Sequence, residues 1–132
     1  GVAAPAFNED AKNYIEKTIN LCKDKNIPIL MLHLPKMSWS YEQSMAMEGF
    51  ANEMGVEYLD LDQEEIRNQL NLDTSVDYYD QGHMNLSGSI RLSRWLGEYL
   101  DNTYDLSDHR SEDAYQKWHE DYELYAERTK LD

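Results

Sequence analysis

One apolar run, residues 27–34 (IPILMLHL), constrains the fold of this chain more than any other feature of its sequence. The run is interrupted by His33 and is ended by Pro35. An apolar run of this length fits a strand that is buried on both faces, which is the pattern of a parallel sheet. Pro28 stands near the start of the run, where a missing N–H is tolerated. We therefore expect a parallel strand that helices cover.

Amphipathic helices are predicted on both sides of this strand. Residues 8–26 carry apolar side chains at helical spacing, with charged side chains between them. Asn8 is suited to cap the start of this helix, and Asn26 is suited to end it. After the strand, Ser40 and Gln43 resemble a capping box, which predicts the start of a second helix.

A second strand and a short helix are predicted next. The second helix is expected to end at Gly55, which supplies a left-handed stop. Residues 56–61 (VEYLDL) form the second predicted strand, and Asp62 begins a short helix that runs to about Leu70. Residues 71–85 show no clear period and are expected to form a loop.

Two further helices complete the predicted order, one from about Ser87 to Asn102 and one over residues 111–128. Helices and strands that alternate with short connections are typical of α/β proteins, and they make the two strands parallel. Two parallel strands are too few for a sheet that is buried on both faces. We therefore expect other strands to lie outside this chain, or a second copy to complete the sheet.

The composition excludes several classes of function. The 132 residues include 26 acidic and 12 basic side chains, for a formal net charge of -14. Nucleic acid and anionic membrane surfaces are recognised through clustered Lys and Arg, so neither is an expected partner. The single cysteine, Cys22, excludes an internal disulfide framework and a Cys-based zinc site. No apolar run approaches the roughly 20 residues that a membrane-spanning helix needs.

The residues best suited to chemistry lie in one loop, residues 77–88 (DYYDQGHMNLSG). Loops at the carboxyl edge of a parallel sheet are where α/β proteins place their sites. Asp80 and His83 are three residues apart, so on a turn the carboxylate can accept a hydrogen bond from the His Nδ1–H. The Nε2 atom then faces outward as a general base, which is half of a Ser–His–Asp triad. Asn85 or Ser87 is suited to cap the next helix.

The same loop supports other interpretations. By composition alone, it is read as a helix-capping loop in which His83 is solvated. Asp77, Asp80 and His83 together form a candidate metal site, although a further ligand is lacking. Asp77 is also an alternative orienter of His83. His33, near the end of the first strand, is expected to be a hydrogen-bonded core residue, with a place in the lining of the site as the alternative.

A family resemblance supports the catalytic interpretation. Asp80 and His83, followed by an Asn two residues after the His and then a Gly, resemble the last catalytic block of SGNH/GDSL-type hydrolases. The runs NIPILMLHLPKMSW and VEYLDLD resemble the two strands before that block, and YYDQGHMNLSGSIRLSRWLGEYL resembles the block with its last helix. DLSDHRSEDAYQKWHEDYELY resembles a tail of often membrane-anchored bacterial members, some of them associated with polysaccharide modification.

This resemblance implies a three-layer α/β/α fold (SGNH/flavodoxin-like) with a parallel sheet, of which this chain holds only the C-terminal half. Asp80 and His83 are then the acid and base of the triad. The family's nucleophilic Ser and its oxyanion-hole Gly and Asn lie in blocks that this chain lacks. The resemblance therefore implies the C-terminal part of a serine esterase, inactive alone, whose partner is the N-terminal half of the same protein.

Further expectations follow from the same resemblance. Acylated surface glycans are the implied substrate class, and no metal or organic cofactor is needed. A membrane-anchored N-terminal segment outside this chain would place the protein outside the cytoplasm; without one it would be cytoplasmic. Trp39, Tyr79 and Asn85 are predicted to contribute to substrate binding, with surface packing for Trp39 and a role in pinning the loop for Tyr79 as the alternatives.

The C-terminal part has its own pattern. Residues 1–110 are predicted to belong to the α/β domain, and residues 111–132 to form an aromatic and acidic helix packed on it. The alternative for this helix is a carbohydrate-binding or partner-binding surface. Its aromatic side chains recur at helical spacing: Tyr115, Trp118, Tyr122 and Tyr125. For the whole chain, the alternatives to an esterase are a non-catalytic interaction module and a domain that forms a homodimer through its sheet edge.

Overall fold

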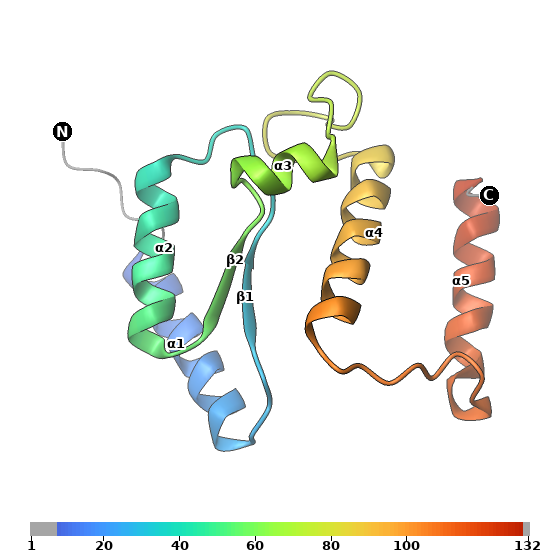
Figure 1. Cartoon of the computed structure of the whole chain (residues 1–132), viewed down its shortest axis with the longest axis horizontal. Helices are drawn as coiled ribbons and strands as arrows, with labels where there is room; N and C mark the ends of the chain where they lie inside the picture. The colour runs from blue at the N-terminus through green and yellow to red at the C-terminus, as the bar shows by residue number, and fades with distance from the viewer. Residues whose placement is uncertain (1–7, 131–132) are drawn as a thin grey trace. The chain divides into compact units, whose positions relative to one another are not determined.

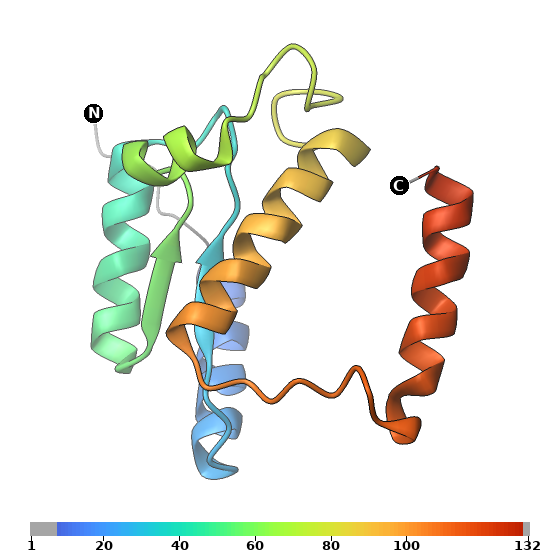
Figure 2. The same ribbon diagram turned by 45° about the vertical axis from the view of Figure 1, so that its right-hand side comes forward.

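The computed structural model describes residues 8–130, and the chain divides into two compact units, Gly1–Trp95 and Leu96–Asp132 (Figures 1 and 2). The first unit contains α1 (Glu9–Asp24), β1 (Leu30–His33), α2 (Tyr41–Met54), β2 (Glu57–Asp60) and α3 (Glu64–Leu70). Helix α4 (Leu86–Thr103) begins in the first unit and ends in the second, which also holds a 3₁₀ turn, η1 (Asp113–Tyr115), and α5 (Gln116–Thr129). None of the described helices combines the length and apolar character needed to cross a membrane.

Local sequence signals place three of the helix ends where they were predicted. Asn8 caps α1, since its side chain accepts a hydrogen bond from the Ala11 N–H at 2.8 Å. Ser40 and Gln43 form the reciprocal capping box that begins α2. Gly55 ends α2 in the left-handed conformation, with φ of 61°. These signals act within a few residues, so they hold independently of the rest of the fold.

The two predicted strands form a parallel pair, which confirms the α/β character of the chain. Leu30 pairs with Glu57 and His33 pairs with Asp60, so the two strands end side by side. β1 is shorter than the predicted residues 27–34, because its pairing partner β2 begins only at Glu57, two residues after the turn at Gly55. Strand length is therefore set by the partner and not by the apolar run.

The burial of the apolar run differs from the prediction of a strand buried on both faces. Met31 is the only residue of β1 that is buried. Leu32 is 36% exposed, and Leu34, just after the strand, is 48% exposed. The reason is that the sheet in the described part of the chain has only two strands, so it lacks the neighbours that cover such a run in a larger parallel sheet.

Two hydrophobic clusters hold the first unit together. Helices α1 and α2 contribute Ile19 and Phe50 to a cluster that includes Met31 of β1. Helices α3 and α4 contribute Leu70 and Leu92 to a second cluster, with Leu59 of β2 packed against it. Successive side chains on a strand point to opposite faces, so the parallel pair is covered by helices on both sides.

Three boundaries differ slightly from the predictions. α3 begins at Glu64 and not at Asp62, because the Asp62 carboxylate accepts a hydrogen bond from the Lys36 N–H at 3.1 Å and stays in the preceding turn. Asn85, and not Ser87, caps α4: its Oδ1 accepts from the Gly88 N–H at 3.1 Å. The last helix begins as η1 at residue 113 and continues as α5 to residue 129.

Candidate active site

The Asp80–His83 loop is a tight, hydrogen-bonded turn between α3 and α4. Tyr78 and Met84 form an antiparallel bridge at its base. The Tyr79 N–H donates to the His83 carbonyl at 2.8 Å, which closes the turn. The backbone itself therefore brings Asp80 and His83 to the same side.

The Asp80 and His83 side chains are in direct contact, as the spacing predicts. His83 Nδ1 lies 2.9 Å from Asp80 Oδ1 and 2.8 Å from Asp80 Oδ2. Asp80 Oδ1 also accepts hydrogen bonds from the backbone N–H of Gly82 at 2.8 Å and of His83 at 2.9 Å. The bond from Gly82, followed by the bond from His83, lowers the pKa of Asp80 below its usual range. Asp80 is therefore ionised at neutral pH and holds the imidazole with Nδ1–H toward it.

The outer nitrogen of His83 is open to solvent. The His83 side chain is 80% exposed and that of Asp80 is 60% exposed. Among residues 8–130, no donor or acceptor bonds to His83 Nε2. An oriented, accessible imidazole nitrogen is the arrangement that a general base requires. Its catalytic role stays a prediction.

This turn lies against the loop that follows β1. The Met37 N–H donates to the Gln81 carbonyl at 3.1 Å, and the Tyr78 hydroxyl lies 3.4 Å from the Pro35 carbonyl oxygen. Residues 35–37 come directly after the end of β1, so these contacts place the turn at the carboxyl edge of the parallel pair. This is the edge at which α/β proteins hold their sites.

Asp77 is a structural anchor and does not orient His83. Its side chain is fully buried and accepts hydrogen bonds from Ser87 Oγ at 2.5 Å and from the Asp73 N–H at 2.9 Å. Arg91 Nε lies 3.6 Å from the same carboxylate. These bonds, with that from Ser87 first, lower the pKa of Asp77. Asp77 is therefore committed to the junction of the loop with α4, which removes it from the alternative metal site with Asp80 and His83.

Replacing Asp77 by Ala is expected to lower the free energy of unfolding by about 3 kcal/mol, because it removes a buried, ionised acceptor and leaves its donors unpaired. The measurement is urea unfolding at pH 7. Asp105→Ala, at an exposed position, is the matched control and should change stability by less than about 0.5 kcal/mol. Equal stability of the two variants would contradict the anchoring role.

The same pair of variants gives a pH dependence of known sign. A carboxyl whose folded pKa is lowered contributes stability above its unfolded pKa, near 4, and loses that contribution as the pH falls further. The difference in stability between the unchanged chain and Asp77→Ala should therefore be largest at pH 6–7 and shrink below about pH 4. A difference that grows on acidification would contradict the lowered pKa.

The three predicted substrate-binding residues have different surroundings. Tyr79 stands in the turn beside the Asp–His pair and is 80% exposed. Both ends of the Asn85 side chain are bonded locally: Nδ2 donates to the Val76 carbonyl, and Oδ1 caps α4. Trp39 stacks on His33, with ring centroids 4.0 Å apart. For Asn85 the structure thus shows a positioning role in the loop, and substrate contact stays a prediction for all three.

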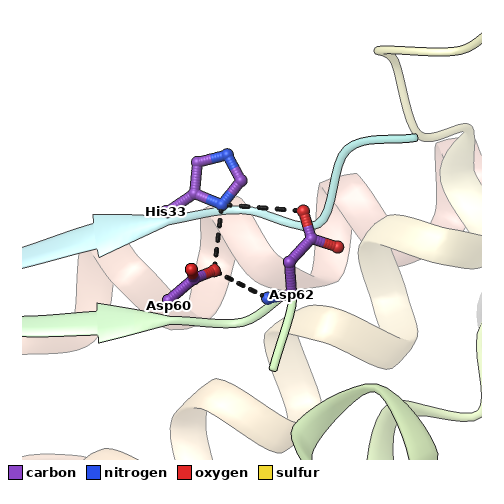
Figure 3. Close-up of side chains that lie close together, drawn as sticks. All are labelled: His33, Asp60 and Asp62. Atoms are coloured by element: carbon purple, nitrogen blue, oxygen red, sulfur yellow. Dashed lines mark hydrogen bonds and ion pairs between the residues drawn. The ribbon is translucent and has the colours of Figure 1, made fainter. Parts of the chain in front are cut away.

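A second polar cluster, which sequence reasoning missed, lies at the ends of the two strands. His33 Nδ1 lies 3.2 Å from Asp60 Oδ1 and 3.7 Å from Asp62 Oδ2 (Figure 3). The sequence singled out His33 without its partners, although polar residues at the ends of two consecutive parallel strands were an available signal. The hydrogen bond from His33 to Asp60 agrees with the expectation of a bonded core histidine.

The aromatic side chains of η1 and α5 are open to solvent. Trp118 is 74% exposed and Tyr122 is 62% exposed, and α5 has no buried residue. Tyr115 stacks on His109, with ring centroids 4.5 Å apart. Packing of this helix on the α/β unit stays a prediction, and an exposed aromatic face is what the alternative of a binding surface requires.

Comparisons with protein-family models, with curated proteins and with solved structures each found no match to this chain.

Proposed function

We propose that this chain is the C-terminal part of a bacterial serine acyl-ester hydrolase of the SGNH/GDSL type and supplies the Asp and His of its triad. The observation that carries the proposal is the contact of His83 Nδ1 with the Asp80 carboxylate, 2.8 Å, with Nε2 exposed at the carboxyl edge of the parallel strands. A carboxylate that holds an imidazole by Nδ1 while Nε2 faces outward is the base and orienter of such a triad.

The exposed apolar residues of the strand pair support the idea that other chain segments complete the sheet. Leu32 and Leu34 are apolar and yet exposed, as expected when strands of a larger sheet are absent. In the proposal, the N-terminal half of the same protein adds those strands and gives the three-layer α/β/α architecture. A second copy of the chain, pairing at the same edges, is the alternative source.

The proposed reaction is acyl transfer through a seryl ester. His83 Nε2 accepts the proton of a Ser hydroxyl from the N-terminal half as the Ser oxygen attacks the ester carbonyl. The protonated imidazole then gives this proton to the leaving alcohol, and a water molecule releases the acid by the same two steps. Asp80 holds the imidazole in the required tautomer throughout. Oxyanion donors, like the nucleophile, come from the N-terminal half.

The substrate class and location belong to the same proposal. Acetyl and other acyl esters of surface glycans are the substrates that the family resemblance favours, with the protein outside the cytoplasm and anchored by a segment that precedes this chain. Tyr79 and Trp39 offer exposed or half-exposed aromatic rings on the loops that meet at this edge. Aromatic rings of this kind stack on sugars and on acyl groups.

The test is the esterase activity of the complete gene product toward a chromogenic acetyl ester. His83→Gln is expected to lower kcat at least about 10³-fold, because the general base is lost. His109→Gln is the matched control, since His109 forms the same kind of exposed pair with Glu112, with Nδ1 2.7 Å from the carboxylate. The control should retain full activity.

Two outcomes would contradict the proposal. Equal kcat of the His83→Gln and unchanged proteins would remove His83 from the reaction. Turnover by the isolated 132-residue chain that depends on His83 would instead show that no upstream nucleophile is needed, which contradicts the division of the triad between two segments.

A further inference from the structure

We propose that His33, Asp60 and Asp62 form a binding site for a divalent transition-metal ion, separate from the Asp80–His83 pair. In the part of the chain that the structure describes, these are the only three His, Cys, Asp or Glu residues whose donor atoms lie together, all within 4.8 Å of one another. The proposal does not depend on the esterase function, because it concerns different side chains and the binding of a metal ion.

The spacing of the donor atoms fits one small cation. His33 Nδ1 is 3.2 Å from Asp60 Oδ1 and 3.7 Å from Asp62 Oδ2. An ion bound at 2.0–2.2 Å to each ligand in tetrahedral geometry holds neighbouring ligand atoms about 3.3–3.6 Å apart. Figure 3 shows both carboxylates on the Nδ1 side of the imidazole ring, with Nε2 directed away from them. An ion that replaces the Nδ1 proton would therefore meet His33 and both carboxylates, whose oxygens lie within 4.8 Å of each other and would move closer together on binding.

The charge of the cluster favours a cation. The exposed fractions of the His33, Asp60 and Asp62 side chains are only 14%, 4% and 15%. In residues 8–130, no Lys or Arg side chain forms an ion pair with either carboxylate. His33 is the only basic side chain paired with them in this part of the chain. Two confined carboxylates with no Lys or Arg beside them gather negative charge, which a bound divalent ion would offset.

Surrounding groups hold the three ligands in place. Ser44 Oγ donates to Asp60 Oδ2, and the Asp62 N–H donates to Asp60 Oδ1 at 2.9 Å. The Lys36 N–H donates to Asp62 Oδ2 at 3.1 Å, and Trp39 stacks on the His33 ring at an interplanar angle of 21°. Ligands oriented by such outer contacts are typical of metal sites.

The donor types indicate which ions should bind. One imidazole nitrogen with two carboxylate oxygens suits Zn²⁺, Co²⁺ and Mn²⁺ better than Ca²⁺, which takes six to eight oxygen ligands. Three protein ligands leave at least one position for water, as in catalytic zinc sites. Zn²⁺ and Co²⁺ are therefore the probes for the test.

The experiment titrates the full chain, freed of metal by a chelator, with ZnCl₂ in a calorimeter. We expect one high-affinity Zn²⁺ per chain, and at least tenfold weaker binding by Asp62→Asn, which keeps the shape of the side chain but removes a ligand charge. His83→Ala and His109→Ala are the controls and should bind Zn²⁺ like the unchanged chain, because those histidines are exposed pairs outside the cluster.

Two further measurements keep the test decisive. Zn²⁺ should raise the Tm of the unchanged chain and not that of Asp62→Asn, provided that both variants show the same circular dichroism spectrum. Co²⁺ should give visible d–d absorption that is lost in Asp62→Asn. The proposal is overturned if the unchanged chain binds no Zn²⁺, if Asp62→Asn binds it equally well, if His83→Ala abolishes binding, or if Ca²⁺ binds in preference.

Discussion

Replacing Asp80 by Asn is expected to lower kcat of the complete protein toward an acyl ester by about 10⁴-fold, the magnitude found when a triad loses its carboxylate. Asp80 accepts from three N–H groups, those of Gly82, the His83 backbone and the His83 ring. An amide oxygen can keep the backbone bonds, so the turn should survive. The Asn side chain is neutral and carries an NH₂ group, so it no longer favours the His83 tautomer with Nδ1–H.

The measurement pairs kcat with the imidazole NMR signals of His83. A loss of kcat together with a change from the Nδ1–H to the Nε2–H tautomer identifies Asp80 as the orienter. Glu112→Gln, which alters the corresponding exposed pair at His109, is the control and should leave both readouts of His83 unchanged. A kcat within tenfold of the unchanged protein would contradict the prediction.

The lowered pKa of Asp80 predicts how the activity of the unchanged protein depends on pH. The bonds from Gly82 and His83 lower the pKa of Asp80. Its carboxylate therefore stays ionised as the pH falls to about 4, the ordinary pKa of an Asp side chain. Protonation of Asp80 should therefore not limit activity above about pH 4. A loss of activity that followed titration of Asp80 at higher pH would contradict the bonded geometry.

Replacing Gly88 by Ala is expected to lower the free energy of unfolding by about 3 kcal/mol, which is the second large effect. A Cβ atom at Gly88 would lie 2.4 Å from the Asp77 carbonyl oxygen and 3.1 Å from the Asp77 Cβ. The first contact is with backbone, which cannot rotate away. Either α4 or the buried Asp77 must shift, and both belong to the junction that supports the Asp80–His83 turn.

Gly97→Ala is the matched control, since Gly97 lies in the same helix and a Cβ there meets nothing within 4 Å. Ala favours helix over Gly, so this variant should be more stable than the unchanged chain by up to about 1 kcal/mol. Urea unfolding of the two variants should therefore give changes of opposite sign. Similar stability of both would show that α4 does not approach Asp77 as closely as described.

Much of the local structure was predictable because its causes lie within a few residues. Asn8 and Ser40 begin their helices, and Gly55 ends one, through bonds or conformations that span three or four positions. The Asp80–His83 contact is of the same kind, since a three-residue turn brings the two side chains together. Side-chain chemistry and backbone preference suffice to predict such features.

The length and burial of β1 depend on more than its own residues. The apolar run predicted a parallel strand correctly, but its length and burial were set by β2 and by the number of strands in the sheet. Leu32 and Leu34 are as apolar as any core residue and are still exposed. Burial depends on which segments are present to cover a side chain, and this information is not contained in the run itself.

The sequence by itself therefore determined the helix ends, the parallel pairing of the strands and the Asp80–His83 contact, each through short-range forces. Only the tertiary structure decided that Asp77 is an anchor and not a partner of His83, and that His33 meets Asp60 and Asp62. His33 and Asp60 are 27 residues apart and become neighbours through the register of β1 and β2. That register depends on which faces of the two strands are buried, so the second polar cluster appears only when the chain is folded.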